Sequence, residues 1–240
     1  MKMSHVPSNV AIVTGGGSGI GRACADALAI AGHQVALLDI DPHSPDPHFP
    51  VVTDVTSTES LAAGVATVER ELGPVSVFVH AAGISGPWTR LLDLSESTWN
   101  QVMDINAAGT FRACKAILPG MVERGYGRVV LVASVAGKEG SALLPAYSAS
   151  KAAVIAIAKA LGKDLAKTGV LVNAITPAGI DAGMTHENSS EIQAKMRAAI
   201  PMGRLGTTDE VAALVTWMAS PACSFSTGAV FDLSGGRSTY

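Results

Sequence analysis

Charged residues are scarce in this chain. They make up 15% of its 240 residues, whereas about 25% is usual in soluble domains. Lys and Arg total 17 against 20 for Asp and Glu, the net charge is -3, and neither sign gathers in a run. The sequence therefore lacks the electrostatic footprint of proteins that bind nucleic acids or anionic membranes. The apolar share of 48% excludes a disordered tail protein and predicts one large globular domain over residues 1–240.

Cysteines and long apolar runs are also few. Cys24, Cys114 and Cys223 lie far apart, without C-x-x-C spacing or clustered histidines, which excludes a disulfide framework and a zinc site. Apolar runs such as 152–158 fall short of the roughly 20 residues that cross a bilayer. The first residues lead into no signal-peptide core. We therefore expect a cytoplasmic protein with no metal site and neither a membrane nor a nucleic acid as a partner.

Short apolar runs alternate with helix-length segments. The runs are rich in Val, Ile and Leu without polar alternation, which is typical of strands covered by helices on both faces. The predicted strands are 10–14, 34–38, 51–53, 75–81, 128–134, 170–175 and 229–232. This order predicts an α/β fold of Rossmann type, with a doubly wound parallel sheet of about seven strands in a single domain. Four prolines between residues 41 and 50 predict a loop between the second and third strands.

The first predicted strand leads into a glycine-rich turn. Thr14 is followed by glycines at 15, 16, 17, 19 and 21, and we expect a helix from about Arg22. Such a turn presents backbone N–H groups and the positive end of the helix dipole, which favours a pyrophosphate. The spacing is T-G-x-x-x-G-x-G, not G-x-G-x-x-G. Because tight strand-to-helix turns need glycine anyway, the turn alone does not establish a nucleotide site.

Asp39 ends the second predicted strand, 18 residues after Gly21. About 20 residues is the usual separation for the acid that binds the adenosine ribose hydroxyls. A carboxylate at this place repels the 2'-phosphate of NADP and so favours NAD. Ser18 and Ile40 carry no charge that attracts that phosphate. The alternative is a turn or cap aspartate, which is the role that fits Asp41 before its proline.

Tyr147 and Lys151 are four residues apart in a helical segment, so their side chains share one face. A phenol has an ordinary pKa of about 10, and a nearby ammonium or a nicotinamide cation favours its phenolate. A Tyr-x-x-x-Lys pair also arises by chance. Ser134, at the carboxyl end of a predicted strand, supports a site because ligands bind at that edge of an open sheet. Ser134 alone also fits a helix cap, and Asn106 in its helical stretch also fits a solvent-facing residue.

Residues 9–236 resemble the short-chain dehydrogenase/reductase family. The resemblance rests on the cofactor turn at 14–21, the pair Asp54-Val55, Asn106, and the group Ser134, Tyr147 and Lys151, in family order and spacing. It implies reversible hydride transfer between nicotinamide C4 and a secondary alcohol or ketone carbon. Tyr147 is implied as general acid and base, and Ser134 as the residue that orients the substrate oxygen.

The resemblance also assigns the remaining site residues. Lys151 is implied to bind the nicotinamide ribose and lower the tyrosine pKa, and Asn106 to hold a water in a proton relay. The implied cofactor contacts are Gly15, Gly17, Ser18, Gly19, Ile20, Gly21, Asp39, Ile40, Asp54, Val55, Ala81, Ala82, Gly83, Tyr147, Lys151, Pro177, Gly179 and Ile180.

The chain departs from the family pattern at three positions. His80 stands where the family usually has asparagine, and we expect it to be a hydrogen-bonded structural residue because Tyr147 already fills the acid-base role. Ala178 replaces a glycine after Pro177, and Ala182 replaces a threonine near the nicotinamide carboxamide. The missing hydroxyl predicts cofactor binding weaker by about 1 kcal/mol, a typical net hydrogen bond.

Residues 179–205 correspond to the family's mobile substrate loop, which sets specificity and excludes water. The candidate substrate-binding residues are Trp88, Ser134, Ala136, Ser141, Leu144, Tyr147 and Met184. Trp88 fits a pocket wall or a packed loop anchor equally well. Lys138, Arg90 and His186 are each able to meet an acidic substrate.

The segments 136–152 and 227–240 look most like sugar-acid dehydrogenases or 3-oxoacyl reductases of the family. Asp39 and the lack of a basic patch for an acidic carrier favour a sugar acid, polyol or other small hydroxy compound. A 3-oxoacyl-type or NADP-dependent ketone reductase and a non-catalytic NAD-binding scaffold are the alternatives. The resemblance further implies a homotetramer whose two longest helices pack across a dyad.

Overall fold

The computed structural model describes residues 8–42, 47–186 and 188–240. Its strands form one sheet in the order β3-β2-β1-β4-β5-β6-β7, and every neighbouring pair is parallel. The strands are β1 (Val10–Thr14), β2 (Gln34–Asp39), β3 (Phe49–Val52), β4 (Val75–His80), β5 (Gly127–Val132), β6 (Val170–Pro177) and β7 (Val230–Leu233). The strand order reverses between β1 and β4, which is the switch point where doubly wound folds bind their ligands. The predicted fold is confirmed.

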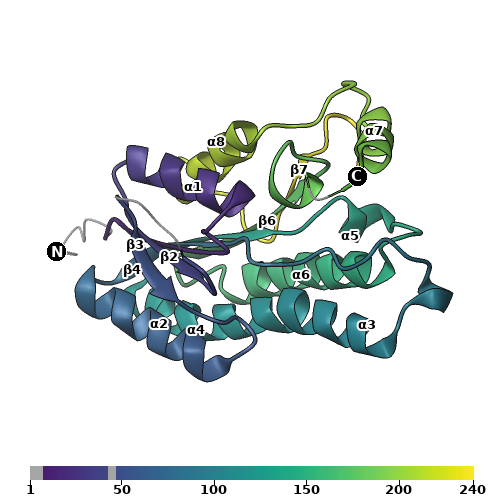
Figure 1. Ribbon diagram of the computed structural model, residues 1–240. Helices are drawn as coiled ribbons and strands as arrows, with labels where there is room; N and C mark the ends of the chain where they lie inside the picture. The colour runs from purple at the N-terminus through teal and green to yellow at the C-terminus, as the bar shows by residue number, and fades with distance from the viewer. Residues whose placement is uncertain (1–7, 43–46, 187) are drawn as a thin grey trace.

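Helices cover both faces of this sheet (Figure 1). They are α1 (Gly19–Ile30), α2 (Thr58–Glu71), α3 (Glu96–Met103), α4 (Gly109–Arg124), α5 (Ala136–Glu139), α6 (Pro145–Asp164), α7 (Ser190–Ala198) and α8 (Thr208–Ala219). One face packs on α1 and α8, the other on α2, α4 and α6, and each interface has its own buried apolar cluster. Short helical turns at η1 (Leu91–Asp93), η2 (Asp104–Ala108) and η3 (Gly183–Thr185) complete the chain.

Several predicted boundaries were wrong by one to three residues. The first helix begins at Gly19, not near Arg22, because Ser18 is already in the extended conformation of an N-cap. Strand β3 begins at Phe49 and includes Pro50, which is tolerated because this strand lies at the edge of the sheet. Strand β6 runs on to Pro177 because its last residues pair with β7.

The carboxyl ends of β4 and β5 also differ from the prediction. Strand β4 ends at His80 and β5 at Val132, so Ala81 and Ser134 lie in the loops that follow. In the described part of the β2–β3 connection there is no helix, as the prolines predict. No helix among the described residues is long and apolar enough to cross a membrane.

Candidate active site

The glycine turn between β1 and α1 is packed too closely for side chains. A Cβ added to Gly15 would lie 2.6 Å from the backbone nitrogen of Ala82, and one added to Gly21 would lie 2.1 Å from the carbonyl oxygen of Gly15. Gly15 and Gly19 also have positive φ angles of 66° and 52°, which glycine adopts without strain. The turn therefore needs its glycines for both its close approaches and its conformation.

The N-terminus of α1 has features of an anion site. The Ser18 side chain makes no capping hydrogen bond, and the first turn holds no acidic residue. The first N–H groups of a helix have no partner within the helix, and the dipole there is positive. Beside the turn, a Cβ added to Gly19 would lie 3.6 Å from Gly183 in η3. The turn thus faces the start of the segment 179–205.

Asp39 contacts this turn directly. Its Oδ2 accepts a hydrogen bond from the backbone nitrogen of Gly17 at 3.0 Å, and its Oδ1 accepts one from that of Asp41 at 3.2 Å. Ile40, the next residue, is largely exposed. The carboxylate is therefore held at the carboxyl edge of β2, against the glycine turn, by two backbone N–H groups.

Asp54 and Val55 follow β3. Asp54 accepts hydrogen bonds from the nitrogen and hydroxyl of Thr56 at 2.8 and 2.7 Å, and these bonds lower the pKa of its carboxyl. Val55 is buried, and a Cβ added to Gly109 in α4 would lie 3.2 Å from its side chain. Asp54 therefore has a local turn role, and its contact with a cofactor stays a prediction.

The loop after β4 carries Ala81, Ala82 and Gly83 past the catalytic candidates. Ala81 donates from its nitrogen to the Thr14 carbonyl oxygen at 3.1 Å. A Cβ added to Gly83 would lie 3.0 Å from Asn106 Oδ1 and 3.3 Å from Lys151 Nζ. Only a residue without a side chain fits between these two groups without displacing them.

Ser134, Tyr147 and Lys151 are brought together by β5 and α6. Ser134 follows β5 and is buried, and its Oγ accepts a hydrogen bond from the Ala136 nitrogen at 3.1 Å. Tyr147 stands in the first turn of α6, which begins at Pro145. A helix start of this kind suits proline because its missing N–H needs no partner there. Lys151 Nζ lies 5.7 Å from the centre of the Tyr147 ring.

The ionisation of this group is dominated by burial. Burial raises the pKa of the Tyr147 phenol above its ordinary value, and a hydrogen bond with Ser134 opposes the rise. Burial lowers the pKa of Lys151 to about 8, while its ammonium donates to the Val132 carbonyl oxygen at 2.8 Å. The protein groups present here do not favour the tyrosine phenolate that the Tyr-Lys spacing predicts, because desolvation of the phenolate outweighs them.

Asn106 is buried in the π-helical turn η2, not on a solvent-facing helix surface. Its Oδ1 accepts from the Ile84 nitrogen at 2.8 Å, and its Nδ2 donates to the Ile84 carbonyl oxygen at 2.8 Å and to Ser150 Oγ at 2.9 Å. Ser150 in turn donates to the Tyr147 carbonyl oxygen at 2.8 Å. Asn106 therefore joins the loop after β4 to the helix that carries Tyr147 and Lys151.

The segment after β6 is fixed through its backbone. Pro177, Gly179 and Ile180 are buried, and Ile180 forms a parallel bridge with Gly206. The Gly206 nitrogen donates to the Gly179 carbonyl oxygen at 3.0 Å, and a Cβ on Gly179 would lie 2.8 Å from the Leu205 side chain. Ala178, at the family's glycine position, is accommodated and donates from its nitrogen to the Leu233 carbonyl oxygen at 3.1 Å.

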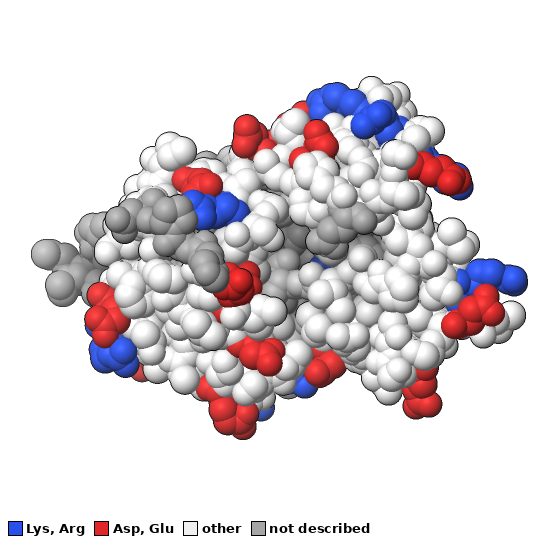
Figure 2. Space-filling model, in the orientation of Figure 1, with Lys and Arg blue, Asp and Glu red and all other residues white. Residues whose placement is uncertain are grey.

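The structure brings only some of the substrate candidates together. Leu144 and Tyr147 line one hollow together with Gly86, Pro87 and Val102. The other candidates, Trp88, Ser134, Ala136, Ser141 and Met184, are not among the residues that line it. Ser141 donates from its nitrogen to Ser148 Oγ at 2.9 Å, and Met184 is 38% exposed. Figure 2 shows a hollow near the middle of the face in view. Most of the residues that border it are uncharged, and the charged side chains lie farther out.

The chain was compared with known proteins. A family model described as "Enoyl-(Acyl carrier protein) reductase" matches residues 15–238. The chain is 42% identical to a 2-dehydro-3-deoxy-L-rhamnonate dehydrogenase (NAD(+)) of Sphingomonas sp. (strain SKA58), covering 96% of this chain and 95% of the relative. It is 36% identical to the 3-oxoacyl-[acyl-carrier-protein] reductase MabA of Mycobacterium avium, covering 95% and 89%. The crystal structure of levodione reductase superimposes with a TM-score of 0.91 at 28% identity, covering 96% and 98%.

The chain belongs to the short-chain dehydrogenase/reductase family. It is accordingly an oxidoreductase, and the predicted family resemblance is confirmed. Within the described residues, no cluster of His, Cys, Asp or Glu has the arrangement of a metal site.

His80 differs from the residue usual in this family, and its surroundings explain how it is tolerated. It is buried at the end of β4, and its Nδ1 is hydrogen-bonded to Thr14 Oγ at 2.7 Å. Burial, with a further effect of the Lys151 charge, lowers the pKa of His80 to about 3, so the ring is neutral. Its Nε2 has no hydrogen-bond partner among the described residues. His80 is therefore a buried, hydrogen-bonded residue, as we expected from the sequence.

The sequence did not predict several contacts that hold Asn106 and Lys151 in place in this short-chain dehydrogenase/reductase. Ile84 binds the Asn106 amide through its backbone, and Val132 accepts from Lys151 through its carbonyl. Backbone groups have no residue-type signal, so no pattern reveals them. Ser150 could have been predicted, because it lies three residues after Tyr147 on the helix that also presents Lys151, and residues three apart share a helix face.

Proposed function

We propose that the chain transfers a hydride reversibly between the nicotinamide of NAD and a secondary alcohol or ketone carbon of a small substrate. The single observation that carries this proposal is the group of Ser134, Tyr147 and Lys151, in which the serine and the lysine are buried and the tyrosine is half-buried. The Ser134 hydroxyl lowers the pKa of the Tyr147 phenol, and the Lys151 ammonium lies 5.7 Å from the centre of the tyrosine ring. This is the geometry expected of a positioned hydroxyl beside a proton donor and acceptor.

Each residue has a distinct proposed role. Ser134 Oγ accepts from the Ala136 N–H, so the serine hydroxyl is oriented to donate its proton to a substrate oxygen when one is bound. Tyr147 gives a proton to that oxygen in ketone reduction and takes it in alcohol oxidation. Lys151 binds the nicotinamide ribose and supplies positive charge beside the phenol. Asn106 holds the loop after β4 against α6 and a water in the path of the proton from Lys151 to solvent.

The residues around the glycine turn fit a dinucleotide. The turn has no room for a Cβ at Gly15 or Gly21, so its backbone is bare of side chains there, and it leads into a helix N-terminus without acidic residues, as a pyrophosphate requires. When bound, the nicotinamide supplies or accepts the hydride at its C4. Ile20, Val55, Ala81 to Gly83 and Ile180 are proposed as further contacts of the dinucleotide.

Asp39 is proposed to set the preference for NAD over NADP. Its carboxylate already accepts from Gly17 in the cradle, and its negative charge opposes a 2'-phosphate at the same place. The Sphingomonas relative carries NAD(+) in its name, which supports this preference.

We further propose a sugar acid, polyol or other small hydroxy compound as the substrate, with residues 179–205 as the substrate segment. The name of the Sphingomonas relative supports a sugar acid. The alternative is a 3-oxoacyl-type ketone reductase, favoured by the similarity to the reductase of Mycobacterium avium. The low share of basic residues opposes docking of an acidic carrier protein.

The assembly is proposed to be a homotetramer in the cytoplasm. On α4, one of the two longest helices, Phe111 is 57% exposed, and this helix is proposed to pack across the dyad. The three cysteines are free and buried, which suits a reducing compartment. Light scattering of the wild type and of Phe111→Asp tests the tetramer, because a buried aspartate on this face is expected to give smaller species.

The proposed chemistry is tested with NADH and NADPH titration followed by oxidation of a panel of sugar acids and polyols with NAD+. We expect NADH to bind and NADPH to bind much more weakly. Replacing Tyr147 by Phe should lower turnover by about 10²-fold or more while NADH binding stays. Retained turnover in this variant contradicts the acid-base role, and activity with 3-oxoacyl compounds alone favours the reductase alternative.

A further inference from the structure

Residues 234–240, here termed the closing segment, follow β7 and lie against α5. Arg237 donates from Nε to Glu139 at 3.0 Å, with Nη2 at 2.9 Å from the same carboxylate oxygen. The Tyr240 hydroxyl donates to the Lys138 carbonyl oxygen, and the Lys138 ammonium lies 5.0 Å from the centre of the Tyr240 ring. The closing segment therefore contacts two consecutive residues of α5 through three kinds of interaction.

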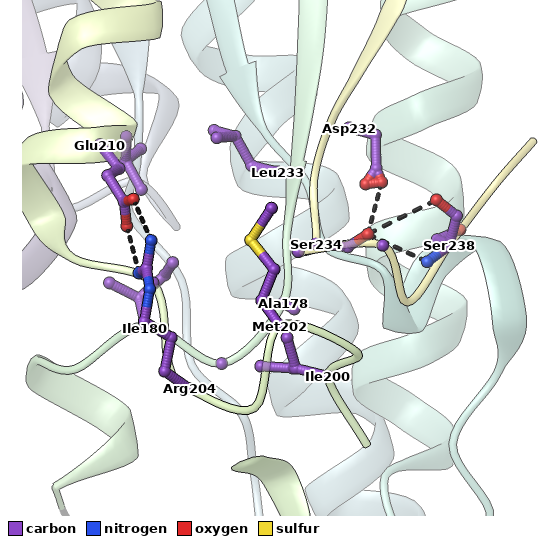
Figure 3. Close-up of a pocket in the computed structure, with 15 residues that line it drawn as sticks. Ala178, Ile180, Ile200, Met202, Arg204, Glu210, Asp232, Leu233, Ser234 and Ser238 are labelled. Atoms are coloured by element: carbon purple, nitrogen blue, oxygen red, sulfur yellow. Dashed lines mark hydrogen bonds and ion pairs between the residues drawn. The ribbon is translucent and has the colours of Figure 1, made fainter. Parts of the chain in front are cut away.

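The closing segment has its own internal order. Ser234 Oγ donates to the Asp232 carboxylate at 2.6 Å and accepts from the Ser238 nitrogen at 2.9 Å. Figure 3 shows this arrangement, with Asp232, Ser234 and Ser238 on one side of a cavity. Arg237 is thus presented to α5 by a turn that is itself hydrogen-bonded.

Helix α5 is the element that orients Ser134. Its first residue, Ala136, donates to Ser134 Oγ, and Gly137 donates from its nitrogen to the Ser134 carbonyl oxygen at 3.0 Å. A Cβ on Gly137 would lie 2.6 Å from the backbone carbon of Lys151, so α5 packs directly on α6 at the lysine. A four-residue helix has little stability of its own, so its position depends on the contacts that it makes.

The other side of the closing segment touches the end of the proposed substrate segment. Met202 donates from its nitrogen to the Gly235 carbonyl oxygen at 3.2 Å, and a Cβ on Gly236 would lie 3.5 Å from Pro201. A cavity of about 400 Å³ lies here, with Ile180, Ile200, Met202 and Gly235 among its lining residues (Figure 3). The closing segment therefore joins this region to α5.

We propose that the closing segment positions Ser134 for the reaction, with Arg237 and Glu139 as positioning residues. The proposal rests on the proposed function, since Ser134 is the residue taken to hold the substrate oxygen. Removing the Arg237 contact releases α5, and with it the Ala136 N–H that orients the serine hydroxyl. Ser134 then loses its alignment with Tyr147. The glycine turn after β1 and Asp39 at the end of β2 take no part in these contacts, so we expect their positions to stay unchanged.

The ion pair between Arg237 and Glu139 is partly shielded from water, so it is strong enough to hold α5. The side chains of Arg237 and Glu139 are 26% and 25% exposed, whereas those of the surface pair Arg70 and Glu71 are 65% and 47% exposed. Exposed pairs contribute little because water screens them. Arg70→Gln is therefore the matched control for Arg237→Gln, because it removes a surface arginine paired with glutamate on α2, which carries none of the proposed site residues.

The first experiment compares steady-state kinetics of these variants. In Arg237→Gln and Glu139→Gln we expect kcat to fall by about tenfold, since small displacements of a catalytic group are costly, while the KM for NAD+ and the binding of NADH stay within about twofold. The exchanged pair Glu139→Arg with Arg237→Glu should recover most of the loss. An unchanged kcat, or an exchanged pair no better than the single variants, overturns the proposal.

The second experiment needs no turnover. Hydrogen exchange of the intact protein should rise in residues 135–140 of Arg237→Gln and not in Arg70→Gln. If the wild type oxidises no compound of the panel, the proposed function fails, and exchange alone decides whether the closing segment holds α5. Faster exchange at 135–140 then supports the positioning of Ser134, and unchanged exchange overturns it whatever the activity.

Discussion

Thr14 at the end of β1 and His80 at the end of β4 are hydrogen-bonded through Oγ and Nδ1 at 2.7 Å. These residues are directly opposed in the register of the two central strands. The glycine turn leaves the sheet immediately after Thr14, and the loop carrying Gly83 leaves it immediately after His80. One neutral histidine therefore links the ends of β1 and β4, and the proposed cofactor site lies between the two loops that follow these strands.

The first prediction concerns acid stability through His80. Its folded-state pKa is about 3 against an ordinary 6.5, so the unfolded chain binds more protons between these values. The free energy of unfolding should therefore fall as pH drops from 6.5 towards 3, by up to about 1.4 kcal/mol per pH unit from this group. Urea unfolding at several pH values measures the slope.

Two variants separate titration from hydrogen bonding at this position. His80→Asn should flatten the acid slope because asparagine does not titrate. Thr14→Val removes the partner hydroxyl and keeps the histidine, so it should lower stability at neutral pH and leave the slope. An unchanged slope in His80→Asn shows that another group causes the acid loss.

The second prediction concerns Lys151. Its folded-state pKa of about 8 lies below the ordinary 10.5, so between these values the unfolded state binds more protons and stability should rise with pH. Lys151→Met should abolish this rise and most of the activity, because it removes the buried charge beside Tyr147. Lys159→Met, on the exposed side of the same helix, is the control and should keep both; a rise that survives in Lys151→Met contradicts the prediction.

The third prediction concerns Asp39 and the choice of cofactor. Asp39→Ala should weaken NADH binding by about tenfold and strengthen NADPH binding, because it removes both the charge and the acceptor of the Gly17 hydrogen bond. Asp39→Asn keeps an acceptor oxygen and removes only the charge. We expect it to gain NADPH binding with a smaller loss for NADH, measured by cofactor fluorescence. Equal ratios of the two affinities in all three proteins contradict the assignment.

The fourth prediction concerns Asn106. Asn106→Ala leaves the Ile84 nitrogen and carbonyl oxygen without their side-chain partner and should lower the free energy of unfolding by about 3 kcal/mol. Asn173→Ala is a matched control, because Asn173 is also buried and joins the Ser226 carbonyl oxygen at 2.8 Å and the Ala229 nitrogen at 3.0 Å. Activity measured well below both melting points should fall in Asn106→Ala far more than in Asn173→Ala. Equal loss in both indicates that Asn106 acts only through stability.

Local sequence patterns were enough to predict the fold and the family of this protein. Continuous apolar strands alternating with helical segments are a local pattern, and a parallel sheet covered on both faces is the arrangement that buries them. The glycine turn, the acid at Asp39 and the spacing of Tyr147 and Lys151 are equally local, because each depends on residues close together in the chain. Strand ends were less well predicted, since pairing with a neighbouring strand decides where β3 and β6 begin and end.

The surroundings of these residues depend on how distant parts of the chain pack together. Burial raises the Tyr147 pKa and lowers those of Lys151 and His80, and burial depends on segments far away in the sequence. The bonds from Asn106 to Ile84 and from Lys151 to Val132 use backbone groups that carry no residue signature. The contact of Arg237 with Glu139 joins residues 98 positions apart, and no local pattern encodes it, because it exists only when the end of the chain folds back onto the helix after Ser134.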